Sequence, residues 1–238
     1  DINVNGVWDV KTLNSISNPK TADINNTINF VVKYKQQKIG DLKFKDINGD
    51  GEIQVSEAEV IKYLAIGSSG NGVNVITDLT GIESFTNLVY LESRYNRLTN
   101  INLTQNIALK SLELYGCGLY NNLNLSQNTN LITLKCSSSG LTDLNLTSNV
   151  NLEYLDCDSN FLTNLDLSQN LNLKYLECNN NQLSNLSVAG LTNLKRLIVF
   201  NNNLTNLDLS NLSSLEDLMC GSNQLTTLNQ TNKWSNLP

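Results

Sequence analysis

A repeat of 21 residues constrains the fold of this 238-residue chain more than any other feature of its sequence. Seven successive units share one pattern of leucines, and they begin at Leu88, Leu109, Leu131, Leu152, Leu173, Leu194 and Leu215. The second unit is one residue longer because of an insertion at Tyr120–Asn122. A unit this short cannot bury its own apolar side, so neighbouring units must stack into one continuous core. We therefore expect a solenoid.

The clearest unit runs from Leu152 to Asn172 and reads LEYLDCDSNFLTNLDLSQNLN. In its first half, strand alternation places Leu155 and Cys157 inward. Tyr154 and Asp156 then face outward. A second alternating stretch returns along the other wall of the solenoid. Each turn is therefore mostly extended chain, with little room for a helix.

Asparagine is as abundant as leucine, with 41 residues of each. In ordinary proteins leucine is among the commonest residues and asparagine is not. One column recurs at the turn after the first half of the unit, and it holds Asn96, Asn160, Asn181, Asn202 and Asn223. Cys117 and Ser139 take this place in the two remaining units. Backbone groups at a turn lose their strand partners, and an amide offers both a donor and an acceptor. We expect an asparagine ladder that bonds the turns above and below, with a looser turn at Cys117 and Ser139. An asparagine-rich ligand surface is the alternative.

The pattern resembles the leucine-rich repeats, specifically the variety with an LDL second half found in bacterial surface proteins. The resemblance covers Leu88 to about Leu228, with a partial leading turn from Ile61 to Asn87. It implies a right-handed solenoid with a mainly parallel β-sheet on the concave face and short extended segments on the convex side. Residues 1–87 would form a small helical N-terminal cap with the leading turn, and residues 88–238 would form the repeats.

Four of the five cysteines occupy one position of the unit. They are Cys136, Cys157, Cys178 and Cys220, and the other units have Ser93, Leu114 and Val199 there. A position that accepts Leu or Val is an inward packing position, where free Cys behaves as a small hydrophobe. We expect buried free thiols rather than a disulfide framework or a metal cluster, because parallel inward vectors suit disulfide geometry poorly. Cys117 is expected to be the most reactive thiol.

Residues 46–57, DINGDGEIQVSE, match the twelve-residue EF-hand loop at each diagnostic position. The expected Ca²⁺ ligands are Asp46, Asn48, Asp50, the backbone carbonyl of Glu52, Gln54 through a water, and Glu57 with both oxygens. Hard oxygen ligands favour Ca²⁺ over zinc. A single loop without a partner hand indicates a structural clamp and not a sensor. The segment resembles the calcium-loop region that often precedes these bacterial repeats; a loop kept for its turn, without metal, is the alternative.

Two helices are expected in the N-terminal domain. One lies near Thr27 to Gln37, with Thr27 as a possible cap, and the other exits the loop from Glu57 to Leu64. The N-terminal segment is expected to cover the open end of the solenoid, because exposed terminal repeats need caps.

Outward positions of the first half of the unit form three columns on the concave face. The first column holds Tyr90, Ser111, Thr133, Tyr154, Tyr175, Arg196 and Asp217. The second holds Glu92, Glu113, Lys135, Asp156, Glu177, Ile198 and Met219. The third holds Arg94, Tyr115, Ser137, Asp158, Asn179, Phe200 and Gly221. Aromatic residues interleaved with carboxylates are typical of recognition surfaces.

We expect the ligand to contact Tyr90, Glu92, Arg94, Tyr115, Tyr154, Asp156, Asp158, Tyr175, Glu177, Arg196 and Phe200. Ile198, Phe200 and Met219 should form an apolar patch toward the C-terminal end. The alternative is a solvated sheet face with scattered apolar residues.

Two other functions are conceivable. The opposite wall carries a row of hydroxyls that could order ice, at Thr99, Thr142, Thr163, Ser184, Thr205 and Thr226. Threonine is also a good β former, which suffices to explain the row. Paired carboxylates such as Asp156 and Asp158 can hydrolyse glycosides, but on an open face we expect both to be solvated, with no pocket to raise one pKa.

Composition narrows the function further. The absence of His excludes Ser-His-Asp and Cys-His catalysis and His-ligated zinc or haem. The net charge of −6 argues against a nucleic-acid partner. No apolar run reaches the roughly 20 residues that span a bilayer, and we find no signal peptide, so we expect no membrane insertion and a mature or trimmed chain. We predict a secreted or surface-displayed bacterial monomer that binds a protein or glycan without catalysis, with Ca²⁺ as its one cofactor.

Overall fold

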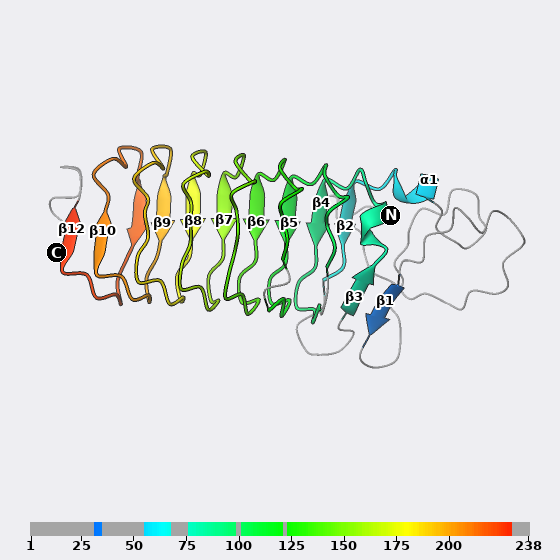
Figure 1. Cartoon of the computed structure of the whole chain (residues 1–238), viewed down its shortest axis with the longest axis horizontal. Helices are drawn as coiled ribbons and strands as arrows, with labels where there is room; N and C mark the ends of the chain where they lie inside the picture. Colours follow the sequence, from blue (N-terminus) through cyan, green and yellow to red (C-terminus); the bar gives the residue numbers. More distant parts are fainter. Residues whose placement is uncertain (1–30, 35–54, 68–75, 99–100, 121–122, 230–238) are drawn as a thin grey trace, which may run out of the picture.

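The repeats wind into a solenoid with a parallel sheet along one wall (Figure 1). The computed structural model describes residues 31–34, 55–67, 76–98, 101–120 and 123–229. The eight strands of the sheet are β2 (Tyr63–Ala65), β4 (Tyr90–Glu92), β5 (Ser111–Glu113), β6 (Thr133–Lys135), β7 (Tyr154–Asp156), β8 (Tyr175–Glu177), β9 (Arg196–Ile198) and β11 (Asp217–Met219). Each unit contributes one strand, and β2 comes from the leading turn. The predicted leucine-rich repeat solenoid is confirmed.

Strand register places equivalent residues of successive units side by side. Leu112 of β5 pairs with Leu134 of β6, and Leu134 pairs with Leu155 of β7. The longer second unit therefore absorbs its extra residue outside the strands. Because the register is unbroken, each outward position becomes a straight column along the sheet.

The core lies between the two walls and consists mainly of leucine. Leu155 and Cys157 of the first half of the unit are fully buried, as predicted. Leu165 and Leu167 face them from the second half and are also buried. On this second wall, β10 (Asn206–Asp208) pairs in parallel with β12 (Thr227–Asn229). One turn thus packs its leucines against those of the turns beside it, and the core continues through all units.

The N-terminal elements differ from the two predicted helices. Val31–Tyr34 forms strand β1, antiparallel to β3 (Ile76–Thr80), where a helix was expected. Helix α1 spans only Val55–Ala58, and Tyr63–Ala65 joins the sheet as β2. Pairing with β4 buries Leu64, and this long-range contact outweighs the local helix propensity. A short 3₁₀ helix, η1 (Ile82–Ser84), follows β3.

The predicted asparagine ladder is present at the turns after β4, β7, β8, β9 and β11. Asn181 Oδ1 accepts a hydrogen bond from Leu162 N at 3.0 Å. Asn181 Nδ2 donates to the carbonyls of Cys157, Cys178 and Asn179 at 3.1, 3.1 and 3.2 Å. Asn160, Asn202 and Asn223 repeat this arrangement. These bonds reach the preceding turn and the amide's own turn, so the expectation of bonds in both directions was half right.

The two substitutions in this column keep their hydrogen bonds. Ser139 Oγ donates to Leu114 O at 2.6 Å and accepts from Cys117 N at 3.3 Å. Cys117 Sγ donates to Ser93 O. Both side chains are fully buried. The looser packing predicted for these turns therefore does not lie at Cys117 or Ser139 themselves.

Three further polar columns account for the excess of asparagine. A buried column, Asn106, Asn128, Asn149 and Asn170, donates from each Nδ2 to two carbonyls of earlier turns. An exposed column, Asn130, Asn151, Asn172 and Asn193, donates once per turn to the preceding turn. A third column, Asn102, Asn124, Asn145, Asp166 and Asp208, accepts the N–H two residues further on. Asparagine is thus fixed at several points of each unit by unpaired backbone groups.

All five cysteines are free, in agreement with the sequence. Cys136, Cys157 and Cys178 are fully buried in the core. The prediction that Cys117 is the most reactive thiol was wrong, because burial raises the pKa of its thiol to about 11. Cys220, near the C-terminal end of the repeats, is half-buried and is the most accessible of the five.

Replacing Asn181 with Ala should lower the free energy of unfolding by about 2 to 4 kcal/mol, because it leaves several buried backbone groups without partners. The matched control is Asn172→Ala, which removes one hydrogen bond from an exposed asparagine at 3.0 Å and should cost less than about 1 kcal/mol. Urea unfolding followed by circular dichroism measures both. Equal losses in the two variants would contradict the role assigned to the buried ladder.

Candidate ligand-binding face

The eleven residues predicted to contact a ligand all lie on the concave face of the sheet or directly after its strands. Each is at least partly exposed, and Tyr175 is the most open, with 37% of its surface exposed. The strand pairings place Tyr154 next to Tyr175 and Asp156 next to Glu177. The register brings together the columns that the sequence predicted.

At the N-terminal end of the face, four charged side chains form one cluster. Arg94 Nε lies 3.1 Å from Glu92 Oε1, and its Nη2 contacts Glu113 Oε2. Lys135 Nζ lies 3.0 Å from the other oxygen of Glu113. Tyr90 donates from its hydroxyl to Glu92 Oε2 at 2.7 Å. Glu113 is only 6% exposed, and two cations compensate for the burial of its carboxylate.

An aromatic pair occupies the middle of the face. The Tyr154 and Tyr175 ring centroids lie 5.8 Å apart at an interplanar angle of 32°. Lys135 Nζ lies 5.7 Å from the Tyr154 centroid, a cation–π contact that joins the pair to the charged cluster. Tyr154 donates to Glu177 Oε1 at 3.2 Å. Burial, together with the carboxylate of Glu177, raises the pKa of the Tyr154 phenol, which therefore stays a donor at neutral pH.

Asp156 and Asp158 do not behave as the solvated pair that the sequence indicated. Burial raises the pKa of Asp156 to about 6, and the neighbouring Asp158 carboxylate adds to this shift. Asp158 N donates to Asp156 Oδ1 at 3.2 Å, and Ser159 Oγ donates to Asp158 Oδ2 at 2.7 Å. The register sets Asp156 between Lys135 and Glu177 of the two adjacent strands, and the carboxylate is partly buried there, so the expectation of a solvated group failed.

The apolar patch at the C-terminal end is smaller than predicted. Ile198 is only 6% exposed, whereas Met219 is 46% exposed and Phe200 is half-buried. The register sets Ile198 between Glu177 and Met219, which flank it on both sides. Arg196 Nε lies 3.6 Å from Glu177 Oε1 and 3.4 Å from Asp217 Oδ2. Polar contacts therefore continue to this end of the face.

The hydroxyl row on the opposite wall is exposed at the described positions, Thr142, Thr163, Ser184, Thr205 and Thr226. Thr226 Oγ1 donates to Thr205 O at 3.3 Å, so at least one hydroxyl serves the fold. Thr99 lies outside the described residues.

Most of the predicted calcium ligands, Asp46, Asn48, Asp50, Glu52 and Gln54, lie outside the described residues. The last predicted ligand, Glu57, lies in α1, and the structure describes its backbone. Among the described residues, no group of three or more carboxylate or thiol side chains is placed to hold a metal ion. The same part of the chain contains no helix long and apolar enough to cross a membrane.

The strand order and the repeating columns define a leucine-rich repeat solenoid, and similar solved structures come from bacteria. Internalin C2 of Listeria monocytogenes is 27% identical, with a TM-score of 0.70 over 79% of this chain and 82% of that chain. The functional domain of InlJ from the same species, which includes a cysteine ladder, is 28% identical with a TM-score of 0.62. The match covers 81% of this chain and 44% of that chain.

A leucine-rich repeat protein of Leptospira interrogans shares the fold at 24% identity, with a TM-score of 0.64 over 73% of this chain and 52% of that chain. This chain therefore spans about half the length of the Leptospira and InlJ structures. No protein-family model matches the sequence, and no curated protein does.

The raised pKa of Asp156 predicts how its charge affects stability. Because the pKa of about 6 in the folded state lies above the unfolded value, folding favours the protonated acid. The stability from this group is complete at pH values below the unfolded pKa and is lost as pH rises through about 6. Asp156→Asn should therefore raise the melting temperature at pH 8 relative to the parent protein, but not at pH 3.

Carboxyl-carbon NMR titration measures the pKa of Asp156 directly. Asp158→Asn serves as the control and should shift the titration of Asp156 to lower pH, because it removes the neighbouring charge. A titration of Asp156 near pH 4 in the parent protein would contradict the assigned burial effect.

Proposed function

We propose that this chain is a non-catalytic binding module that recognises a protein ligand on the concave face of its sheet. The observation that carries the proposal is the continuous set of contacts across that face, from Tyr90 and Arg94 through Tyr154 and Tyr175 to Arg196. Side chains that are already fixed by neighbours lose little conformational entropy when a partner binds.

The dimensions and chemistry of the face suit a protein epitope. Eight strands at about 4.8 Å spacing give a face roughly 35 Å long, which is enough for an interface of standard size. Tyrosine supplies contact area together with a polar tip, and charges of both signs favour a partner with complementary charges. A glycan could use the same groups, so it is the alternative ligand for this face.

A secreted or surface-displayed location is part of the proposal. It rests on the structural similarity to internalin C2 and InlJ of Listeria monocytogenes, which are 27% and 28% identical. The buried thiols are compatible with such a location, because burial protects Cys136, Cys157 and Cys178 from oxidation.

Binding to arrays of extracellular proteins and of glycans tests the concave face. Tyr154→Ala combined with Tyr175→Ala should weaken a protein interaction at least about tenfold, because the pair lies at the centre of the face. Thr163→Ala combined with Thr205→Ala, on the opposite wall, is the matched control and should bind as the parent does. Binding that survives the tyrosine variant and is lost in the control would place the ligand on the convex wall.

We also propose that residues 46–57 hold a structural Ca²⁺ ion through Asp46, Asn48, Asp50, Glu52, Gln54 and Glu57. The support is the sequence of the loop, with its oxygen ligands at EF-hand spacing. Calcium at about 100 times its dissociation constant would stabilise the folded protein by about 2.7 kcal/mol.

Thermal unfolding with calcium and with EDTA measures this effect. The melting temperature should rise with calcium, and Asp46→Ala combined with Glu57→Ala should abolish the rise. Asp41→Ala, outside the loop, is the control and should keep it. A melting temperature that EDTA leaves unchanged in the parent protein would refute the metal site.

One observation favours a second function, hydrolysis of glycans by a carboxylate pair. The pKa of Asp156 is raised to about 6, and a second carboxylate, Asp158, lies two residues further along the chain; such chemistry uses a pair of carboxyl groups. Assays with a panel of glycosides test this function. Turnover that Asp156→Asn abolishes would establish it, and a blank panel would remove it.

A further inference from the structure

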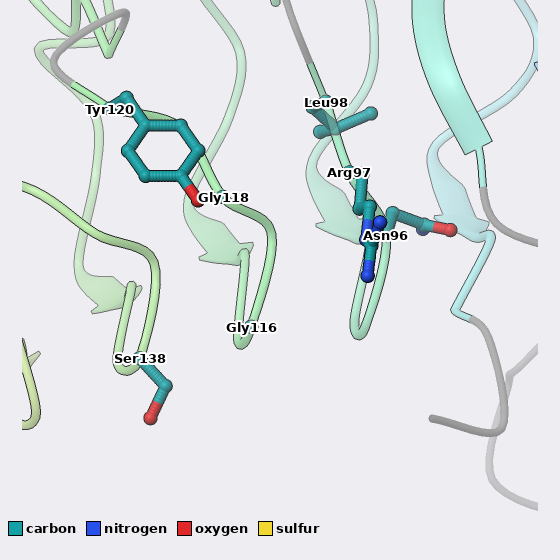
Figure 2. A pocket seen from close by; sticks show the side chains of 7 residues that line it. All are labelled: Asn96, Arg97, Leu98, Gly116, Gly118, Tyr120 and Ser138. Carbon is teal, nitrogen blue, oxygen red and sulfur yellow. The ribbon is translucent and has the colours of Figure 1, made fainter. Parts of the chain in front are cut away.

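The longer second unit opens a cleft at the edge of the solenoid, away from the outward columns of the sheet. The cleft has a volume of about 710 Å³ and is lined by Asn96, Arg97, Leu98, Gly116, Gly118, Tyr120 and Ser138. Figure 2 shows Tyr120 on one side, Arg97 and Asn96 on the other, and the two glycines between them. We propose that this cleft binds an acidic sugar residue, with its carboxylate at Arg97 and its ring against Tyr120.

The hydrogen bonds between turns change at the cleft. At the equivalent position of other units, Phe161 N donates to Leu141 O at 2.8 Å and Gln182 N donates to Leu162 O at 2.9 Å. Gly118 forms no such bond to another described residue. The preceding turn is joined through the adjacent backbone groups instead, where Leu98 N donates to Cys117 O at 2.9 Å, beside the insertion at residues 120–122.

Arg97 supplies the positive charge of the cleft. The Arg97 side chain is exposed and forms no ion pair with another described residue. Its guanidinium offers the paired N–H donors that bind a carboxylate.

Tyr120 supplies a flat apolar wall. Its ring packs over the backbone of two glycines; an added Cβ would lie 3.4 Å from the ring at Gly118 and 3.0 Å from it at Gly140. Both glycines have positive φ, which side-chain-bearing residues rarely adopt, and at Gly140 an added Cβ would also crowd the ring. The ring is held from one side while 72% of Tyr120 remains exposed. An exposed aromatic ring gives a flat area on which a sugar ring can stack.

These features favour a sugar over a peptide. The lining consists of two glycines and three polar side chains, with Leu98 and Tyr120 as its apolar residues, whereas a peptide side chain needs an apolar hole. Arg97 places a positive charge at the cleft, and this favours a ligand that carries a carboxylate. The net charge of −6 of the whole chain disfavours unspecific binding of anions elsewhere. The chemistry that fits is a pyranose ring bearing one carboxylate, as in a hexuronic acid or its oligomers.

Isothermal titration of the full chain with a galacturonic acid trimer tests the proposal. The comparison ligands are the uncharged galactose trimer and acetate, which lack the carboxylate and the ring respectively. The acidic trimer should bind at least about tenfold more tightly than either, and Arg97→Gln and Tyr120→Ala should each weaken it about tenfold. Tyr175→Ala, on the concave sheet, is the control and should bind as the parent does.

Three outcomes would overturn the site. They are acidic-trimer binding that Arg97→Gln and Tyr120→Ala leave unchanged, binding that is lost in Tyr175→Ala, and no measurable binding of the acidic trimer. Both altered side chains are exposed, so the variants should melt as the parent does. A failure here leaves the concave-face proposal untouched, because the two sites share no residue.

Discussion

Hydrogen bonding of the backbone at the turns is the constraint on which the whole structure depends. A solenoid with three-residue strands leaves many N–H and C=O groups without strand partners, and most of these lie where water cannot reach them. Buried amides such as Asn181 and Asn149 satisfy them, each binding several backbone groups at once. Because each amide reaches back to the preceding turn, the same bonds also set the register of the stack.

That register creates the concave face. Parallel pairing without a shift aligns every outward position into a column, so a residue's neighbours are its counterparts in adjacent units. Short contacts between columns then become possible, such as the pair Tyr154 and Tyr175 or the two cations on Glu113. A surface whose side chains are ordered in this way before binding is suited to recognition, and its order comes from the turns beneath it.

The same logic explains the edge cleft and the N-terminal end. In the second unit, Cys117 and the glycines around it replace larger residues, and the bond that would join Gly118 to the preceding turn is lost. The column itself survives, because Ser139 and Cys117 take over part of the amide's role. At the other irregular place, β1 pairs with β3 and so gives this strand a partner before the regular units begin.

The sequence by itself determined the solenoid, the sheet columns and the inward cysteines, because a 21-residue period fixes which positions face the core whatever the details of packing. It also indicated the ladder at Asn181, since unpaired backbone at a turn demands a polar partner. Tertiary structure alone decided which segments depart from local propensity, as at Tyr63–Ala65, where pairing with β4 replaces a helix. It alone decided the burial of Cys117, the raised pKa of Asp156 and the edge cleft at Gly118. These properties depend on which atoms of adjacent turns surround a residue, and the repeat pattern of the sequence does not give the distances to those atoms.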